Sequence, residues 1–186
     1  MNTDALRYAG FWPRLGANLL DGLILLPLFA LTTWGRSQFP LFDVYYFLPF
    51  ILFQLFYNVC LVQRYGGTPG KLIVGIRIRR LNGEPVGYRE PFLRYLPDFL
   101  FTILGWIGLI SLALHRSGPE FHALPLINRI ILKTELLPPW YVPLQRLQAV
   151  WDLGELIVLL TNQKKRAIHD FIAGTVVVRA SPDSRR

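Results

Sequence analysis

Residues 99–114 read FLFTILGWIGLISLAL and contain no charged side chain. A helix over this stretch presents apolar side chains on every face, as a membrane span does. Extended back to Phe92, the segment reaches about the 20 residues that cross a hydrocarbon core. Charge is scarce in the whole chain, since 17% of its 186 residues are charged and 52% are hydrophobic. The sequence therefore predicts an integral membrane protein.

Four segments are predicted to cross the membrane, at about residues 17–34, 44–62, 92–114 and 140–160. The fourth contains three charged residues, each of which costs about 2.5–3.5 kcal/mol at the centre of a lipid-facing helix. We therefore expect the fourth segment to lie inside the bundle, where its charges can pair with other helices. The expected fold is an all-α, four-helix transmembrane bundle, formed by residues 1–186 as a single domain.

The distribution of basic residues predicts the orientation of these spans. Of the 20 Lys and Arg residues, fifteen fall at the two ends of the chain, between the second and third spans or at the start of the third span, and four fall in the other loops. Under the positive-inside rule, both termini are cytoplasmic and the protein is multi-pass in a bacterial cytoplasmic membrane. The net charge of +8 then indicates contact with anionic lipid on the cytoplasmic side, not nucleic acid.

Residues 71–88 are predicted to form a cytoplasmic β-hairpin. Apolar residues alternate along Lys71–Leu81, and Asn82-Gly83 is a favoured hairpin turn. Val86–Tyr88 would form the short return strand. Because two strands alone are marginally stable in water, we expect the apolar stretch at the end of the cytoplasmic tail, residues 161–186, to complete a small sheet.

The loop between the third and fourth spans is predicted to face outward and to contain an interfacial helix. Leu124, Ile127, Ile130 and Ile131 recur at helical spacing beside polar residues. This pattern is typical of an amphipathic helix lying in the membrane interface.

Asp21 lies about one turn inside the first span, seven residues after Arg14 and on the same helix face. An ionisable residue within a span is a candidate functional residue by default. Asp21 is therefore a candidate cation or proton site. The alternative is a structural ion pair with a basic residue on another span, since paired charges also hold helices in register.

Asp152 and Glu155 are three residues apart on one face of the fourth span. Two neighbouring carboxylates raise at least one pKa, which gives a group that exchanges protons. Both are candidate proton-binding residues. The alternative is that Arg146 and Arg14 neutralise them.

Three more residues are candidates for charge pairing. Arg94 and Asp98, four apart at the start of the third span, are expected to form a pair on the helix surface. Asp170 follows the fourth span and is expected either to cap the structure of the tail or to form a salt bridge with Arg14.

No pattern in the sequence predicts catalysis, a cofactor or a metal. Three scattered His residues and one Cys lack a recognised metal-ligand spacing. Residues 66–71, GGTPGK, lack the spacing of a phosphate-binding loop. We therefore expect a protein that is not an enzyme and that has no cofactor.

The chain resembles the RDD family of integral membrane proteins, which is named for one arginine and two aspartates. Three stretches carry the resemblance: WPRLGA at 12–17 followed by Asp21, GGTPGK at 66–71, and RAIHD at 166–170 followed by AGT at 173–175. The resemblance places the family arginine on Arg14 and the aspartates on Asp21 and Asp170. It implies transport, and cation/proton antiport is attributed to some members.

Two functions are therefore expected from different classes. One is a cation/proton-coupled transporter, or a subunit of one, which four spans could form as a homo-oligomer with a shared pathway. The other is an accessory or scaffolding subunit of a larger membrane complex, to which the outward loop and the basic cytoplasmic region would offer surfaces.

Overall fold

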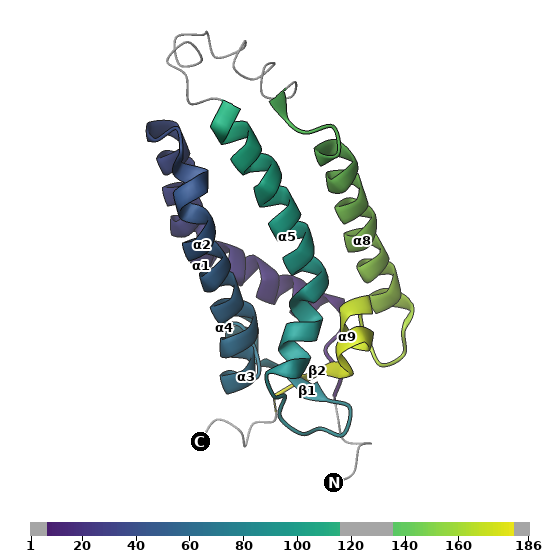
Figure 1. The fold of residues 1–186 in the computed structure, drawn as a ribbon. Coiled ribbons are helices and arrows are strands. Elements are labelled where there is room, and N and C mark those ends of the chain that lie inside the picture. Colours follow the sequence, from purple (N-terminus) through teal and green to yellow (C-terminus); the bar gives the residue numbers. More distant parts are fainter. Residues whose placement is uncertain (1–6, 116–135, 181–186) are drawn as a thin grey trace. The chain divides into compact units, whose positions relative to one another are not determined.

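The computed structural model describes residues 7–115 and 136–180, and Figure 1 traces its elements. By their internal contacts the residues form two compact units. Unit 1 comprises residues 1–26, 53–97 and 151–186, and unit 2 comprises residues 27–52 and 98–150. The division falls at Pro27 and just after Pro97, each inside a helix. A proline there removes one backbone hydrogen bond from the helix.

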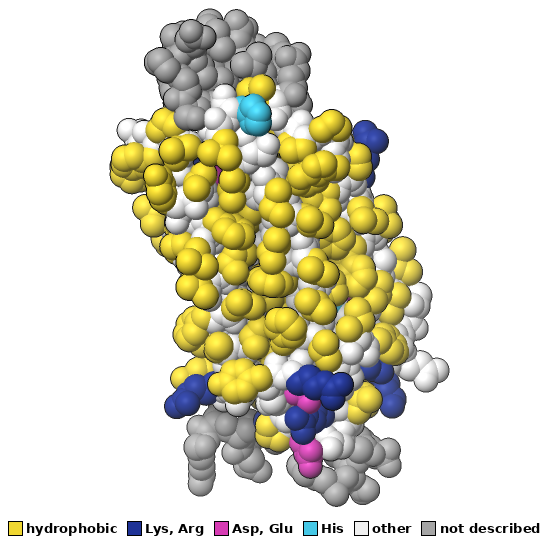
Figure 2. All heavy atoms as spheres, viewed as in Figure 1, with side chains coloured by type: hydrophobic (Ala, Val, Ile, Leu, Met, Phe, Trp, Pro, Cys, Tyr) yellow, Lys and Arg dark blue, Asp and Glu magenta, His cyan; other side chains and the backbone are white. Residues whose placement is uncertain are grey.

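Three helical segments in the described residues are long and apolar enough to cross a membrane. They are α1 (Phe11–Gln38), the segment Phe42–Val74, and α5 (Arg89–His115). Each contains one of the first three predicted spans. Hydrophobic side chains cover most of the face drawn in Figure 2, as expected for a surface in contact with lipid. The chain is thus mostly helical and of the membrane class.

The second of these segments is not one regular helix. It consists of α2 (Phe42–Leu55), a π-helical turn η2 (Phe56–Cys60), α3 (Leu61–Tyr65) and α4 (Pro69–Val74). The fourth predicted span coincides with α8 (Tyr141–Thr161), which is 21 residues long. Because of its charged residues, α8 is not among the helices apolar enough to cross a membrane by composition. The four-helix transmembrane bundle therefore remains a prediction.

The predicted hairpin over residues 71–88 is wrong in its first and last parts. Residues up to Val74 are helical because Pro69 starts α4, where a proline at the first helical position costs no hydrogen bond. Gly75 ends the helix in the left-handed conformation, with φ +76°. Only Ile76–Arg80 forms a strand, β1, and a single bridge between Arg79 and Pro85 replaces the return strand.

The predicted contribution of the tail to a sheet is confirmed. After the short helix α9 (Ile168–Ala173), strand β2 (Thr175–Arg179) pairs antiparallel with β1 and places Ile78 opposite Val177. The residues before α1 join the other edge of β2, where Tyr8 bridges Val178. A small two-stranded sheet therefore ties three distant parts of the sequence together.

The core of unit 1 includes residues of both strands of this sheet. Ile76 and Ile78 are buried, while the alternate Arg77 and Arg79 are partly exposed, as the alternation in the sequence predicts. The buried cluster contains residues from the N-terminal segment, α1, α3, both strands and the loop after β1: Ala9, Ala17, Val62, Ile76, Ile78, Val86 and Val177.

Unit 2 is organised around Trp106 of α5. This side chain is buried, and the rings of Phe47 and Phe50 lie 6.0 and 5.1 Å from it. The guanidinium of Arg36 lies 5.4 Å above the same ring and is paired with Asp43. Aromatic packing therefore holds the helices of this unit. The predicted amphipathic helix near residues 124–131 lies outside the described residues.

Candidate functional site

Asp21 lies on α1 and accepts hydrogen bonds from three groups in unit 1. The Tyr57 hydroxyl donates to its Oδ1 at 2.5 Å, and the Gly70 N–H donates to the same oxygen at 2.7 Å. The Thr68 hydroxyl donates to Oδ2 at 2.5 Å. The side chain is 9% exposed, so this carboxylate is bound almost entirely by protein.

The local sequence explains how these donors reach Asp21. Tyr57 belongs to η2, and π-helical turns of this kind are frequent at functional sites. Thr68 is the residue before α4, and Gly70 lies in the first turn of that helix, so the break in the second segment presents both donors. The Lys71 ammonium donates to the Thr68 hydroxyl at 3.3 Å, which links a cation to the site through one uncharged group.

Gly70 is required by the close approach of α4 to α1. A Cβ atom at this position would lie 2.2 Å from the Ala17 carbonyl oxygen and 2.8 Å from Asp21 Cγ. These are backbone and carboxylate atoms, which cannot move aside without separating the helices. The GGTPGK stretch thus packs directly on the carboxylate of Asp21.

Asp170 is the centre of a second cluster, in which two arginines clamp one buried carboxylate. Arg14 of α1 donates to Oδ2 at 2.7 Å, and Arg94 of α5 donates to Oδ1. Asp170 is fully buried and Arg14 is 7% exposed. We call this set, Arg14, Asp170 and Arg94, the Asp170 clamp.

Further hydrogen bonds complete the clamp. The Ala167 N–H donates to Asp170 Oδ2 at 3.0 Å, and the Thr175 hydroxyl donates to Oδ1 at 3.2 Å. Arg14 also donates to the carbonyls of Ala9 at 3.2 Å and Lys165 at 2.5 Å. Because a buried charge is costly unless paired and hydrogen-bonded, this full set of partners is what permits its burial.

Glu155 and His169 form a carboxylate–imidazole pair beside the clamp. The His169 backbone N–H donates to Glu155 Oε1 at 2.9 Å, and His169 Nδ1 contacts Glu155 Oε2. Both side chains are 17% exposed. The other ring nitrogen, Nε2, is buried without a hydrogen-bond partner among the described residues, 3.9 Å from Asp170 Oδ1.

The surroundings keep His169 neutral. Burial lowers the pKa of His169 well below its usual range, and the positive charges of Arg94, Arg14 and Lys71 lower it further. A neutral ring next to a carboxylate carries its proton on Nδ1, which donates to Glu155 and leaves the lone pair on Nε2. The pair therefore leaves an uncharged imidazole whose Nε2 lone pair is open.

The structure does not gather the three acids predicted as ion or proton sites. Asp21 is held by uncharged donors, and Glu155 lies against His169. Asp152 is exposed in unit 1, and Arg146 is exposed in unit 2. Of the charge pairs, the Arg14–Asp170 pair is present, and Arg94 is bonded to Asp170 and Thr175. The Asp98 carbonyl accepts a hydrogen bond from Thr102.

Two members of these clusters gave little signal in the sequence. Tyr57 is one of many aromatic residues in an apolar stretch, and only the two polar neighbours in its segment, Gln54 and Asn58, could have drawn attention to it. Thr68 lies within the GGTPGK motif, but nothing in the motif shows that its hydroxyl points to Asp21.

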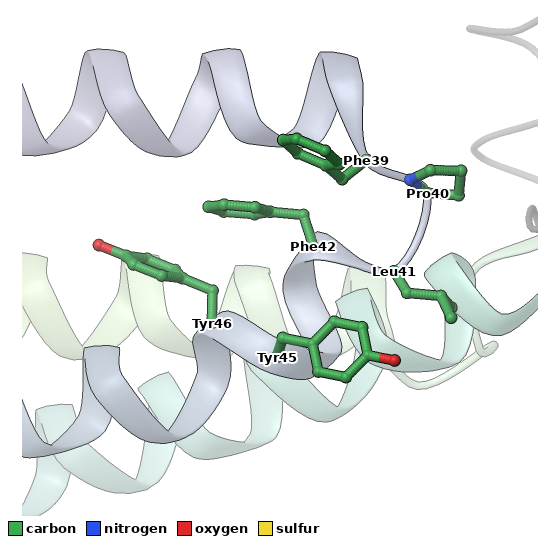
Figure 3. Close-up of a pocket in the computed structure, with 6 residues that line it drawn as sticks. All are labelled: Phe39, Pro40, Leu41, Phe42, Tyr45 and Tyr46. Carbon is green, nitrogen blue, oxygen red and sulfur yellow. The ribbon is translucent and has the colours of Figure 1, made fainter.

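Unit 2 contains an apolar pocket of about 630 Å³ at the turn between α1 and α2. Figure 3 shows its lining, in which the Phe42 and Tyr46 rings stack with centroids 4.8 Å apart. Its lining consists of Phe39, Pro40, Leu41, Phe42, Tyr45 and Tyr46. Since no lining residue is charged, the pocket suits an apolar group and not an ion.

Comparison with known proteins shows the family of the chain. The chain is 28% identical to the uncharacterized protein YckC of Bacillus subtilis (strain 168), over 94% of this chain and 86% of that protein. It is 29% identical to the uncharacterized protein YxaI of the same organism, over 56% of this chain and 85% of that protein. The RDD family model matches residues 8–174, which include Arg14, Asp21 and Asp170. The chain belongs to the RDD family.

Proposed function

We propose that this RDD-family membrane protein carries a cation across the bilayer in exchange for protons, with Asp21 as the cation-binding carboxylate. One observation carries the proposal: Asp21 is buried in a membrane-spanning helix, yet its carboxylate is held by uncharged donors. The ion pairs formed by the described residues do not include Asp21.

The contrast with Asp170 supports this assignment. Asp170 is neutralised by two arginines, so its charge is already used within the fold. Asp21 lacks such a direct partner in the described residues, and carboxylate oxygens are the ligands that hard cations prefer. The hydroxyl hydrogens of Tyr57 and Thr68 can rotate away, so that an oxygen lone pair faces a cation that enters. Asp21 is therefore the better candidate for a binding group.

The proposed topology has four crossings and cytoplasmic ends. Strands β1 and β2 are hydrogen-bonded, so both lie on one side of the membrane. Between them lies α5, which is long and apolar enough to cross the membrane, so in this topology the chain crosses back before β2. In the described part of that stretch α8 is the long helix; at about 1.5 Å per residue its 21 residues match a hydrocarbon core of about 30 Å. The excess of Lys and Arg near the ends and in the β1 region supports a cytoplasmic position for the sheet.

A second function, an accessory subunit of a larger complex, predicts that Asp21 has no role in flux. Four spans in one chain enclose only a narrow pathway for a cation. We therefore propose that the transporter is a homo-oligomer with a shared pathway. Anionic lipid on the cytoplasmic side is the proposed lipid partner of the basic residues there. Measurement of flux separates the two functions.

The experiment reconstitutes purified protein into liposomes with a trapped pH dye and an inward gradient of Na⁺ or K⁺. Transport predicts proton movement that depends on the cation and on the amount of protein. Asp21→Asn keeps the size of the side chain and should abolish this movement. Glu84→Gln is the matched control, because Glu84 is an exposed acid of unit 1 whose side chain is 60% exposed.

Two results contradict the proposal. One is an absence of cation-dependent proton movement in liposomes that contain folded, oriented protein. The other is equal movement with wild-type protein and Asp21→Asn. Either result, together with co-purification of one fixed membrane partner from native membranes, favours the accessory function.

A further inference from the structure

His169 carries a buried nitrogen that the fold does not use. Its Nδ1 contacts the Glu155 carboxylate, while Nε2 has no hydrogen-bond partner in the described part of the chain. Buried polar atoms are nearly always satisfied, so each exception calls for a physical reason. An unprotonated Nε2 is a base, and both side chains of the pair keep some exposure, through which a proton from water can arrive.

The position of Nε2 connects this base to the Asp170 clamp. Nε2 lies 3.9 Å from Asp170 Oδ1, which is the same oxygen that Arg94 contacts. A proton on Nε2 would create an N–H that needs only a small movement to donate to this oxygen. Arg94 and a protonated His169 would then compete for one acceptor while repelling each other.

The charges around His169 come from five elements. Glu155 of α8 and Asp170 of α9 favour its protonation. Arg14 of α1, Lys71 of α4 and Arg94 of α5 oppose it. Because burial and the three cations lower the pKa of His169 well below its usual range, the closed clamp excludes a proton. Movement of Arg94 away from Asp170 would remove one of these cations.

We propose that His169, paired with Glu155, is the proton-binding site of this protein, and that proton binding at Nε2 and the Arg94–Asp170 contact exclude each other. A proton from cytoplasmic water adds to the Nε2 lone pair and gives an imidazolium. Nδ1–H keeps its bond to Glu155, Nε2–H takes Asp170 Oδ1, and Arg94 leaves that oxygen. This proposal rests on the proposed cation/proton exchange only for what the bound proton does, because cation binding is assigned to Asp21 and its neighbours.

The test is a titration of one imidazole in the full-length chain. The sequence has three His residues, so His115→Gln with His122→Gln leaves His169 as the only one. In ¹⁵N-histidine-labelled protein in lipid nanodiscs, imidazole nitrogen shifts report both the protonation state and the tautomer. The expected result is a neutral ring protonated on Nδ1 at pH 7, with a titration midpoint well below the ordinary 6.5.

The Arg94→Gln variant then tests mutual exclusion. Removal of this cation should raise the midpoint of His169 by about one pH unit. Lys71→Gln leaves the Asp170 clamp intact and should raise the midpoint of His169 by a smaller amount. This variant replaces Arg94→Gln in the test if Arg94→Gln does not fold. The control is Arg80→Gln, which removes a partly exposed cation that pairs with Glu84 and Glu90, and should leave the midpoint unchanged.

A midpoint near 6.5 in the parent protein would overturn the inference. So would a midpoint that neither Arg94→Gln nor Lys71→Gln moves. Failure of this inference is distinguishable from failure of the proposed transport. An absence of cation-dependent flux would not affect the titration result for His169. A titration midpoint of His169 near 6.5 would not affect the proposed role of Asp21.

Discussion

Arg14 and Asp170 are 156 residues apart in the sequence, yet Arg14 donates to Asp170 Oδ2 at 2.7 Å and both side chains are buried. The contact joins the start of the first membrane helix to the short helix before the last strand. Together with the bridge from Tyr8 to Val178, it ties the beginning of unit 1 to the end of the chain. Arg14 and Asp170 therefore have an architectural role.

Asp170→Asn should strongly destabilise the protein. The substitution leaves the buried Arg14 and the partly buried Arg94 beside a neutral amide. Breaking a buried ion pair by removing one partner costs about 3–5 kcal/mol. The measurement is thermal unfolding in a mild detergent. Glu84→Gln, which removes an exposed acid, should melt with the wild-type protein. Equal melting temperatures for Asp170→Asn and wild type would contradict the structural role of the clamp.

Part of the fold could be predicted from the sequence alone. Hydropathy located three apolar helical segments, each of which extends beyond its predicted span, because a lipid environment imposes a minimum length and an apolar composition on a span. The tail strand could be predicted because β-branched residues follow a turn. The hairpin was wrong because alternation over Lys71–Val74 is too short to exclude a helix, and the Thr68-Pro69 start outweighed it.

The site was only partly predictable for a related reason. The spacing of Arg14 and Asp21 marked both as functional candidates, but periodicity within one helix does not show which residues of other helices face it. Tyr57, Thr68 and Gly70 approach Asp21 through a π-helical turn and a helix break. Such irregular backbone leaves little trace in a hydropathy pattern.

Gly70→Ala should lower stability, since the added methyl group would lie 2.2 Å from the Ala17 carbonyl oxygen. Overpacking of this kind costs about 1–3 kcal/mol and would move α4 away from Asp21. The expected result is a lower melting temperature together with weaker cation-dependent flux.

The matched control for Gly70→Ala is Gly22→Ala. Gly22 lies next to Asp21 in α1, but an added Cβ atom there meets nothing within 4 Å. Alanine is also about 1 kcal/mol better than glycine in a helix, so this variant should be neutral or slightly more stable. If the two alanine variants behave alike, the close approach at Gly70 is not what positions α4.

Stability should fall as the pH is lowered from about 6.5, because the folded state lowers the pKa of His169. Above that pH the ring is neutral in both states and contributes no pH dependence. Below it the unfolded chain binds a proton that the folded chain does not, so the free energy of unfolding decreases by up to about 1.4 kcal/mol per pH unit until the folded pKa is reached.

Melting temperatures at pH 7.5, 6.5 and 5.5 check this dependence. His169→Gln should flatten the change between pH 6.5 and 5.5. His115→Gln should leave it in place, because His115 is exposed and its ring contacts the Ser111 carbonyl in its own helix. A slope that persists in His169→Gln would assign the effect to other groups, such as the carboxylates.

The four-crossing topology predicts opposite labelling of two exposed positions. Cys60 is the single cysteine, so Cys60→Ser gives a cysteine-free background. Ser37→Cys lies at the end of α1, and Lys164→Cys lies three residues after α8. A membrane-impermeant maleimide should label Ser37→Cys in intact spheroplasts and Lys164→Cys only after permeabilisation. Labelling of Lys164→Cys and Gln163→Cys from outside would contradict this topology. Because β2 follows α8 and pairs with β1, that result would place the sheet on the outer side of the membrane. It would then no longer follow that α8 returns the chain to the cytoplasm.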